Sequence, residues 1–139
     1  MKALKIYSLA LMLLTSMVMS ACFEEKDDDF TVLGPVASIP AFTLSKNNPT
    51  AGETITVSIR YYSENIAVEE IRLTETIGTG AATVVTTKSI TDFDINDSYV
   101  DTFDYVVPAV AAGTVIRLTV EIQTTNDLMN SRFGNVTVN

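Results

Sequence analysis

The densest group of side chains that could do chemistry lies between Asp92 and Asp101, where oxygen-bearing residues recur at short intervals. Carboxylate and amide oxygens are the ligands that calcium prefers, and a calcium site takes about six to eight of them. The residues that could supply them here are Asp92, Asp94, Asn96, Asp97 and Asp101. The sequence therefore offers calcium as the one candidate cofactor.

The same segment has a second interpretation. It does not follow the EF-hand pattern, because Asp97 stands where that loop needs glycine and Phe103 where it needs a bidentate glutamate. A polar turn between two strands would have the same composition, with Asp side chains capping their own backbone. In that case we expect Phe93 and Ile95 to reach into the core.

Composition argues against catalysis and against nucleic acid as a partner. The 139 residues include no His and one Cys, so the chain has no Ser-His-Asp or Cys-His nucleophile system, no His-ligated zinc and no internal disulfide. Paired carboxylates could hydrolyse a glycosidic bond, but they need a cleft lined for sugar, and the chain has no Trp. The net charge of −8 argues against nucleic acid as a partner, because binding its phosphates requires clustered Lys and Arg. We expect a protein that is not an enzyme.

Four residues are candidate ligand contacts. Tyr62 alternates with Tyr61 and should therefore face away from the core. Leu128, Met129 and Phe133 are apolar side chains in the stretch from Asn126 to Gly134, which we expect to be a polar loop. They either plug the end of the domain or contact a partner, which would be a glycan or another envelope protein.

The first 21 residues are typical of a secretory signal. Lys2 and Lys5 precede an apolar run from Ile6 to Met19, and the small residues Ser20 and Ala21 follow it. The alternative is a membrane-spanning helix, but the run is shorter than the roughly 20 apolar residues that a bilayer requires.

The residues Met19-Ser20-Ala21-Cys22 resemble the lipobox of bacterial lipoproteins. The resemblance implies that Cys22 becomes the first residue of the mature chain and carries a diacylglycerol thioether, a palmitate-type anchor. Each buried CH₂ of such a chain contributes about 0.8 kcal/mol to membrane binding. The alternative is an ordinary signal peptide followed by a free thiol.

Residues 22–36 predict an acidic tether behind the lipid. Phe23 to Phe30 contain five acids and one base, a composition that repels itself and cannot pack. The segment is similar to the export signal that directs surface lipoproteins of the Bacteroidota to the outer face of the outer membrane. A plain spacer would have the same chemistry.

Apolar residues with a period of two dominate residues 37–139, the predicted folded domain. The clearest strands are Thr54–Tyr61, Ile116–Ile122, Thr102–Val107 and Glu69–Ile77, each with alternate side chains suited to a core. Weaker patterns predict strands at Phe42–Leu44, Thr83–Ile90 and Asn135–Val138.

Turn residues separate these runs at short intervals, for example Gly34-Pro35, Gly78-Thr79-Gly80 and Pro108 with Gly113. Seven short strands and no helical period predict an all-β, antiparallel β-sandwich. A helix over residues 63–71 is disfavoured, because Glu69 and Glu70 would occupy its apolar face. Pro40 should lie in an edge strand, where a missing N–H donor costs nothing.

Two longer motifs carry a resemblance to bacterial immunoglobulin-like and fibronectin type III-like domains. The segment Pro49-Thr50-Ala51-Gly52-Glu53-Thr54-Ile55-Thr56-Val57 looks like the start of their second strand. Val107-Pro108 followed by Ala112–Val120 is similar to the passage into their sixth strand. The resemblance implies an immunoglobulin-like sandwich of the kind found on bacterial surface lipoproteins, including accessory proteins of glycan uptake. It does not imply a function, since these motifs encode turns and core.

Two functions from different classes follow from the sequence. The domain is a surface binding or accessory module that recognises a glycan or protein through loops at one end. Alternatively, it is a structural spacer or assembly subunit of an outer-membrane complex that pairs through an edge strand. An exposed patch of Tyr62, Leu128, Met129 or Phe133 would favour the first, and a long unpaired edge would favour the second.

Overall fold

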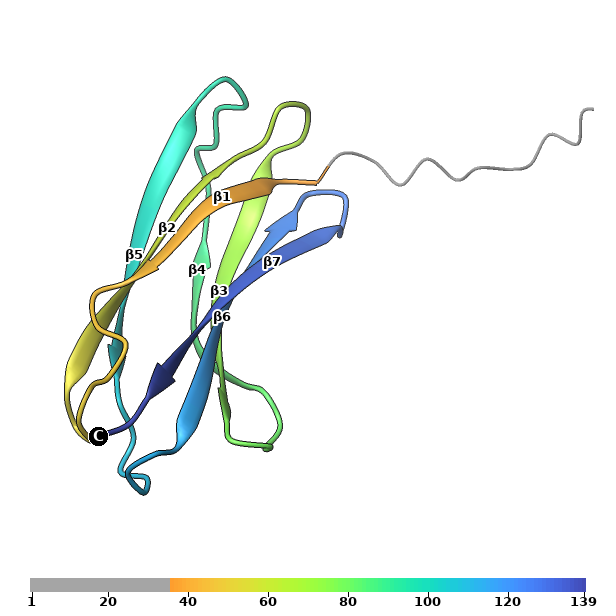
Figure 1. The fold of residues 1–139 in the computed structure, drawn as a ribbon. Coiled ribbons are helices and arrows are strands. Elements are labelled where there is room, and N and C mark those ends of the chain that lie inside the picture. Colours follow the sequence, from red (N-terminus) through yellow and green to blue (C-terminus); the bar gives the residue numbers. More distant parts are fainter. Residues whose placement is uncertain (1–35) are drawn as a thin grey trace, which may run out of the picture. The chain divides into compact units, whose positions relative to one another are not determined.

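The computed structural model describes residues 36–139 (Figure 1). The predicted signal peptide, the lipidation site Cys22 and nearly all of the tether lie outside the described residues. The described chain is all-β, with seven strands and no helix. The strands are β1 (Ser38–Leu44), β2 (Thr54–Tyr62), β3 (Val68–Ile77), β4 (Thr83–Ser89), β5 (Ser98–Val106), β6 (Val115–Thr124) and β7 (Met129–Thr137). Within residues 36–139, then, no helix has the length and hydropathy to cross a bilayer.

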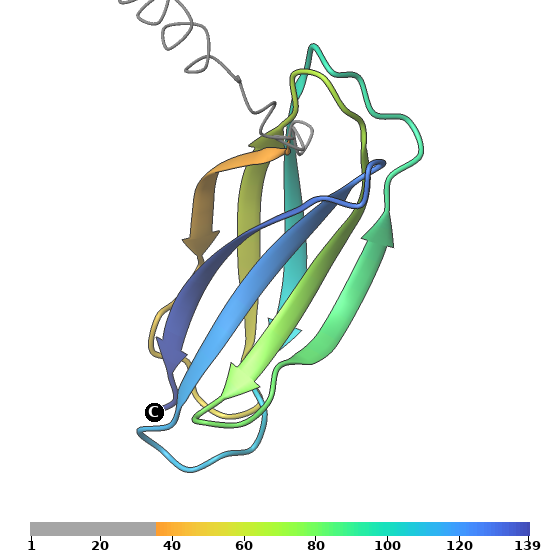
Figure 2. The same ribbon diagram turned by 90° about the vertical axis from the view of Figure 1, so that its right-hand side faces the viewer.

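The strands form two antiparallel sheets packed as a sandwich. One sheet has the order β1-β2-β5, and the other has the order β4-β3-β6-β7. Figure 2 looks onto the four-stranded sheet, with β1, β2 and β5 behind it. This confirms the predicted immunoglobulin-like β-sandwich. The fourth strand pairs with β3, whereas in constant-type immunoglobulin domains it joins the sheet of the first, second and fifth strands.

The core lies between the sheets and is built by alternate side chains of β2, β3, β5 and β6. Ile55, Val57, Ile59 and Tyr61 of β2 are all at most 1% exposed, and their neighbours Thr56 and Ser58 are only half-buried. β-branched and aromatic residues suit this arrangement because they pack well on a pleated surface. The other sheet contributes mainly Ile71, Leu73, Ile116, Leu118, Val120 and Ile122.

Three strands begin four or more residues earlier than the sequence pattern predicts. β1 begins at Ser38 rather than Phe42, and β5 begins at Ser98 because it pairs with β2 along its whole length. β7 begins at Met129, so the expected loop from Asn126 to Gly134 is wrong: the turn is short and most of this stretch is strand. The pattern was hidden because the inward positions of β7 include Asn130, Arg132 and Gly134 rather than apolar side chains.

The polar inward residues of β7 join the two sheets along one side of the sandwich. Asn130 Nδ2 donates a hydrogen bond to the Ala37 carbonyl at 2.8 Å. Arg132 Nη1 donates to the carbonyls of Ile39 and Pro40 at 2.7 and 2.9 Å. These carbonyls are available because Pro40 interrupts the β1–β2 pairing at a bulge, which confirms its predicted edge position. The side between β1 and β7 is therefore closed.

Gly134 lets β1 approach β7 closely. A Cβ atom placed on Gly134 would lie 2.6 Å from Phe42 Cε1 and 3.0 Å from Leu44 Cδ1, both on the inner face of β1. Only a residue without a side chain allows the Phe42 ring to rest on the β7 backbone. Both neighbours are half-buried and pack against the core.

We expect Gly134→Ala to destabilise the domain, because the added methyl overlaps the Phe42 ring. Overpacking of this kind costs about 1–3 kcal/mol, which for a domain near 100 residues lowers the midpoint of thermal unfolding by roughly 5–15 °C. The matched control is Ser131→Ala on the outer face of the same strand, which should change stability by less than about 0.5 kcal/mol. Equal midpoints for Gly134→Ala and the wild type would contradict the contact.

Candidate functional site

The acidic segment from Asp92 to Asp101 is a turn followed by the start of β5. Asp94 Oδ1 accepts hydrogen bonds from the backbone N–H and the side-chain amide of Asn96, both at 2.9 Å. The two bonds to Asn96, the backbone one first, hold the pKa of the Asp94 carboxyl below its usual range. The predicted capping of the backbone by Asp is confirmed here.

The aromatic residues of this segment form a cluster with β2. Phe93 and Tyr99 have ring centroids 4.8 Å apart, and the Tyr61 ring stacks on Tyr99 at 5.6 Å. The prediction that Phe93 reaches the core is confirmed, because it packs against the buried residues. The same prediction for Ile95 is wrong: Ile95 is 42% exposed, at the tip of the turn.

The five predicted calcium ligands are not brought together by this arrangement. Asp94 is bonded to Asn96, whereas Asp101 lies on β5 and is bonded to Tyr61 and Lys88. Within residues 36–139, no three His, Cys, Asp or Glu side chains are close enough to hold a metal ion. Calcium binding by this segment stays a prediction.

A polar seam lines the side of the sandwich between β4 and β5, opposite the closed side. The Tyr61 hydroxyl donates to Asp101 Oδ2 at 2.8 Å, and Asp101 also forms an ion pair with Lys88 of β4. The Tyr105 hydroxyl donates to Glu75, which in turn accepts a bond from the Thr83 hydroxyl. Each buried tyrosine therefore ends at a carboxylate on the rim of the core.

Both seam tyrosines resist ionisation. Desolvation, followed by the neighbouring carboxylate, raises the pKa of Tyr61 and of Tyr105 far above the ordinary value of 10.0. A phenol with a raised pKa in the folded state stabilises the fold below pH 10. That contribution is lost as the pH climbs from 10 toward the raised value, because the unfolded chain releases the proton first.

We expect the folded domain to show a late phase in the alkaline titration of its phenols, followed by ultraviolet absorbance of the phenolate. Tyr61→Phe and Tyr105→Phe should each remove part of this phase, and each should flatten the loss of stability above pH 10. Tyr62→Phe, which lacks a carboxylate partner among the described residues, is the control and should leave the late phase intact. A titration without a late phase in the folded protein would contradict the seam.

The four predicted ligand contacts do not form one patch. Tyr62 is half-buried and lies on the outer face of the three-stranded sheet, paired with Ser38 and Ser98. Met129 and Phe133 lie on the outer face of the four-stranded sheet and are 49% and 54% exposed. Leu128 is half-buried in the turn before β7. The expectation that Met129 and Phe133 plug the end of the sandwich is therefore wrong.

Phe133 has a neighbour of its own on the outer face. The Arg117 guanidinium carbon lies 4.4 Å from the centroid of the Phe133 ring, within the range of a cation–π contact. This contact explains an exposed aromatic in β7 without a ligand.

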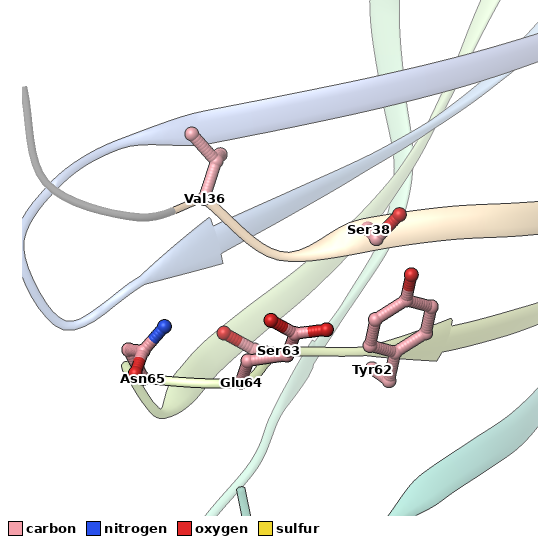
Figure 3. Close-up of a pocket in the computed structure, with 6 residues that line it drawn as sticks. All are labelled: Val36, Ser38, Tyr62, Ser63, Glu64 and Asn65. Carbon is pink, nitrogen blue, oxygen red and sulfur yellow. The ribbon is translucent and has the colours of Figure 1, made fainter.

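A small pocket lies at the end of the sandwich where β1 begins. We call it the Tyr62 pocket; its lining residues are Val36, Ser38, Tyr62, Ser63, Glu64 and Asn65, and its volume is about 220 Å³. Tyr62 ends β2, and the next three residues begin the loop to β3. In Figure 3 the side chains of Tyr62, Glu64 and Asn65 extend from the β2 side toward Ser38 and Val36.

Ser63 is the unusual member of this lining. The residue is 1% exposed, and its hydroxyl oxygen has no hydrogen-bond partner. A buried hydroxyl without a partner costs about 1–3 kcal/mol, so native proteins rarely keep one without a reason. The sequence pattern indicates Tyr62 but not Ser63, Glu64 and Asn65. The signal for them is a run of polar residues directly after an outward-facing aromatic at a strand end.

β4 is the other exposed feature that the sequence did not reveal. All seven residues from Thr83 to Ser89 are exposed on both faces, because the three-stranded sheet does not extend under this strand. Val84 and Val85 are 58% and 37% exposed. In Figure 2, β4 lies at the right-hand border of the sandwich, and no strand covers its outer edge.

Comparison with known proteins supports the fold and no more. No protein-family model and no curated protein matches the chain. Similar structures include a Niemann-Pick type C2 protein from the Japanese carpenter ant, with 8% identity and a TM-score of 0.55 over 77% of this chain and 96% of that one. The sporulation control protein Spo0M from Bacillus subtilis has 10% identity and a TM-score of 0.51, over 76% of this chain and 50% of that one.

A looser likeness is to β-glucuronidase 2 of Bacteroides uniformis, with 17% identity and a TM-score of 0.41. It covers 76% of this chain but 13% of the glucuronidase. At these identities the first two likenesses demonstrate a shared sandwich, and the site must be argued from its own residues.

Proposed function

We propose that the protein is a non-catalytic lipoprotein of the bacterial outer membrane, of the Bacteroidota surface type, that binds a partner protein of the envelope through the edge of β4. The observation that carries this proposal is an edge strand exposed along its whole length. The single Cys after a signal-like segment and the acidic tether support the anchor and its exposure at the cell surface. The sandwich then serves as an accessory or assembly module.

The groups in the interior and at the rim of the sandwich have structural roles, which fit a non-catalytic protein. Apolar side chains fill the space between the sheets. The carboxylates at the rim, Glu75 and Asp101, accept hydrogen bonds from Tyr105 and Tyr61, which is a structural use of both groups. The chain contains no His to act as a base at neutral pH.

The two sides of the sandwich differ in how their edges are protected. On the closed side, side chains of β7 bond to β1, and the backbone N–H groups of Thr137 and Asn139 donate to the carbonyls of Asn47 and Pro49. On the open side, β4 has no proline, and its one charged residue, Lys88, is paired with Asp101. A β-bulge in β4, opposite Leu73 and Thr74, is the feature that still disfavours pairing of this edge with another strand.

An extended segment of a partner fits such an edge. Added strands gain main-chain hydrogen bonds along the edge and specificity from alternate side chains. Val84 and Val85 are exposed apolar side chains of β4, which a partner strand with apolar residues would cover. By contrast, the predicted loop contacts Tyr62 and Phe133 lie on opposite sheets, so recognition through one loop surface has less support.

The anchor predicts a modified amino terminus. We expect mass spectrometry of the protein from its native envelope to give a chain that begins at Cys22 and carries a diacylglycerol thioether. Cys22→Ser should abolish membrane retention without changing the unfolding midpoint of the domain, since the residue lies before the sandwich. A chain from the envelope that keeps Met1, or that begins after Cys22, would contradict lipidation.

The edge predicts a charge-sensitive interaction. We expect wild-type protein that carries a photo-crosslinker at position 87 of β4 to capture a partner protein from envelope extract. The double substitution Val84→Lys and Val85→Lys, with the crosslinker at the same position, should lose this partner. Lysine on an exposed edge discourages strand pairing, and both sites are exposed enough that stability should change by less than about 1 kcal/mol.

The matched control is Val106→Lys on the outer face of β5, where the residue is 61% exposed. This variant should retain the partner. Equal recovery with the β4 variant and the wild type would contradict the proposal. If the crosslinked species is a second copy of this chain, the proposed partner is wrong and the edge serves self-assembly.

A further inference from the structure

The Tyr62 pocket carries a second inference that does not depend on the β4 edge. It combines a partly open pocket, the half-buried ring of Tyr62, and the polar side chains of Ser38, Glu64 and Asn65. It lies on the three-stranded sheet and the β2–β3 loop, whereas β4 belongs to the other sheet. A ligand there and a strand on β4 would therefore occupy separate surfaces.

The size of the pocket limits the ligand. Its volume is about 220 Å³. Sites for drug-sized ligands span about 300–1,000 Å³. The pocket therefore takes a single small ring or a terminal unit of a longer chain.

The charge of the lining excludes anions. Glu64 contributes a carboxylate that has no ion-pair partner among the described residues, and none of the six lining residues is basic. A phosphate, sulfate or carboxylate would meet this negative charge without compensation. A hard cation is also poorly served, because one carboxylate and a few neutral oxygens do not complete its shell of six or more ligands.

The hydrogen-bonding groups of the lining distinguish a neutral polyol from an ammonium group. Ser38 and Tyr62 carry hydroxyls that both donate and accept, and Asn65 carries an amide with both functions. An ammonium has three donors and no acceptor, so it could bond to the Glu64 carboxylate but could not accept from the donor groups of the lining. Hydroxyl groups on a ligand can accept from Asn65 and donate to Glu64 at the same time.

The ring of Tyr62 adds an apolar surface. It is half-buried at the end of β2 and borders the polar groups on one side of the pocket (Figure 3). A pyranose presents hydroxyls at its rim and C–H bonds on its face, so it can rest on the ring while its hydroxyls bond to the loop. We infer that the Tyr62 pocket binds one pyranose unit of a neutral glycan.

The inference is tested by NMR titration of the chain from residue 22, with Cys22→Ser to keep it free of lipid. The probes are methyl glycosides of common hexoses, tested up to tens of millimolar, and ethylamine as the ammonium alternative. We expect at least one glycoside to shift the backbone amides of residues 36–38 and 62–65 with a dissociation constant in the millimolar range. A pocket of this size provides few contacts, which is the reason for weak binding.

Variants distinguish binding in the Tyr62 pocket from weak binding elsewhere on the surface. Tyr62→Ala and Glu64→Gln should each weaken binding at least tenfold, whereas Phe133→Ala, which removes an exposed aromatic from the other sheet, should leave it unchanged. Ser63→Ala should leave binding unchanged without lowering stability, because the hydroxyl it removes is buried and has no partner in the protein.

Three results would overturn the inference. The first is that no glycoside shifts these amides at the highest concentration. The second is that ethylamine shifts them and no glycoside does, which would assign the pocket to an ammonium ligand. The third is that Phe133→Ala abolishes the shifts as completely as Tyr62→Ala.

Discussion

Burial of one face of each sheet against the other is the constraint on which the rest of the structure depends. Ile55, Val57 and Ile59 of β2 and Ile116, Leu118 and Val120 of β6 are all nearly inaccessible. Because the side-chain period of a strand is two, a slip of one residue in any pairing would move such a set to the solvent. The register of the central strands is therefore fixed, and the sites on the outer faces inherit their positions from it.

The core leaves two unequal sides. Between β1 and β7 the gap is narrow, because Gly134 leaves room for the Phe42 ring. The Asn130 amide and the Arg132 guanidinium of β7 donate hydrogen bonds to backbone carbonyls at the start of β1. Between β4 and β5 the gap is polar, and an ion pair and tyrosine hydroxyls connect the sheets. The two sheets have four edge strands, and contacts between β1 and β7 cover two of them. The candidate interaction sites are the edge of β4, on the open side, and the Tyr62 pocket, where β1 begins.

The sequence predicts the central strands well because their signal is the core itself. The alternation from Thr54 to Tyr61 and from Ile116 to Ile122 corresponds to β2 and β6 within three residues at each end. β7 was shortened in the prediction because Asn130, Arg132 and Gly134 face inward to meet the backbone of β1, a tertiary reason that no local pattern contains. Ile95 was placed inward by alternation, but it lies in a turn where alternation does not apply.

The candidate sites were less predictable than the fold. Tyr62 was found from its outward position in the strand, but the pocket around it depends on the pairing of Ser38 with Tyr62 across 24 residues of sequence. The exposure of β4 follows from the fact that its sheet is wider than the opposing one, which only the strand order reveals. Composition could exclude catalytic systems that need His, but it could not locate a surface.

The contacts between β1 and β7 also determine how the domain would respond to mechanical load. Ala37 faces Asn130, Ile39 faces Arg132, and Phe42 faces Gly134, so the two strands run in the same direction. β1 begins at the end of the sandwich opposite the carboxyl terminus (Figure 1). A pulling force applied between the two ends of the described chain would therefore drag β1 and β7 past each other along their lengths. Their contacts, and the ladder between β1 and β2, would have to break together rather than one after another.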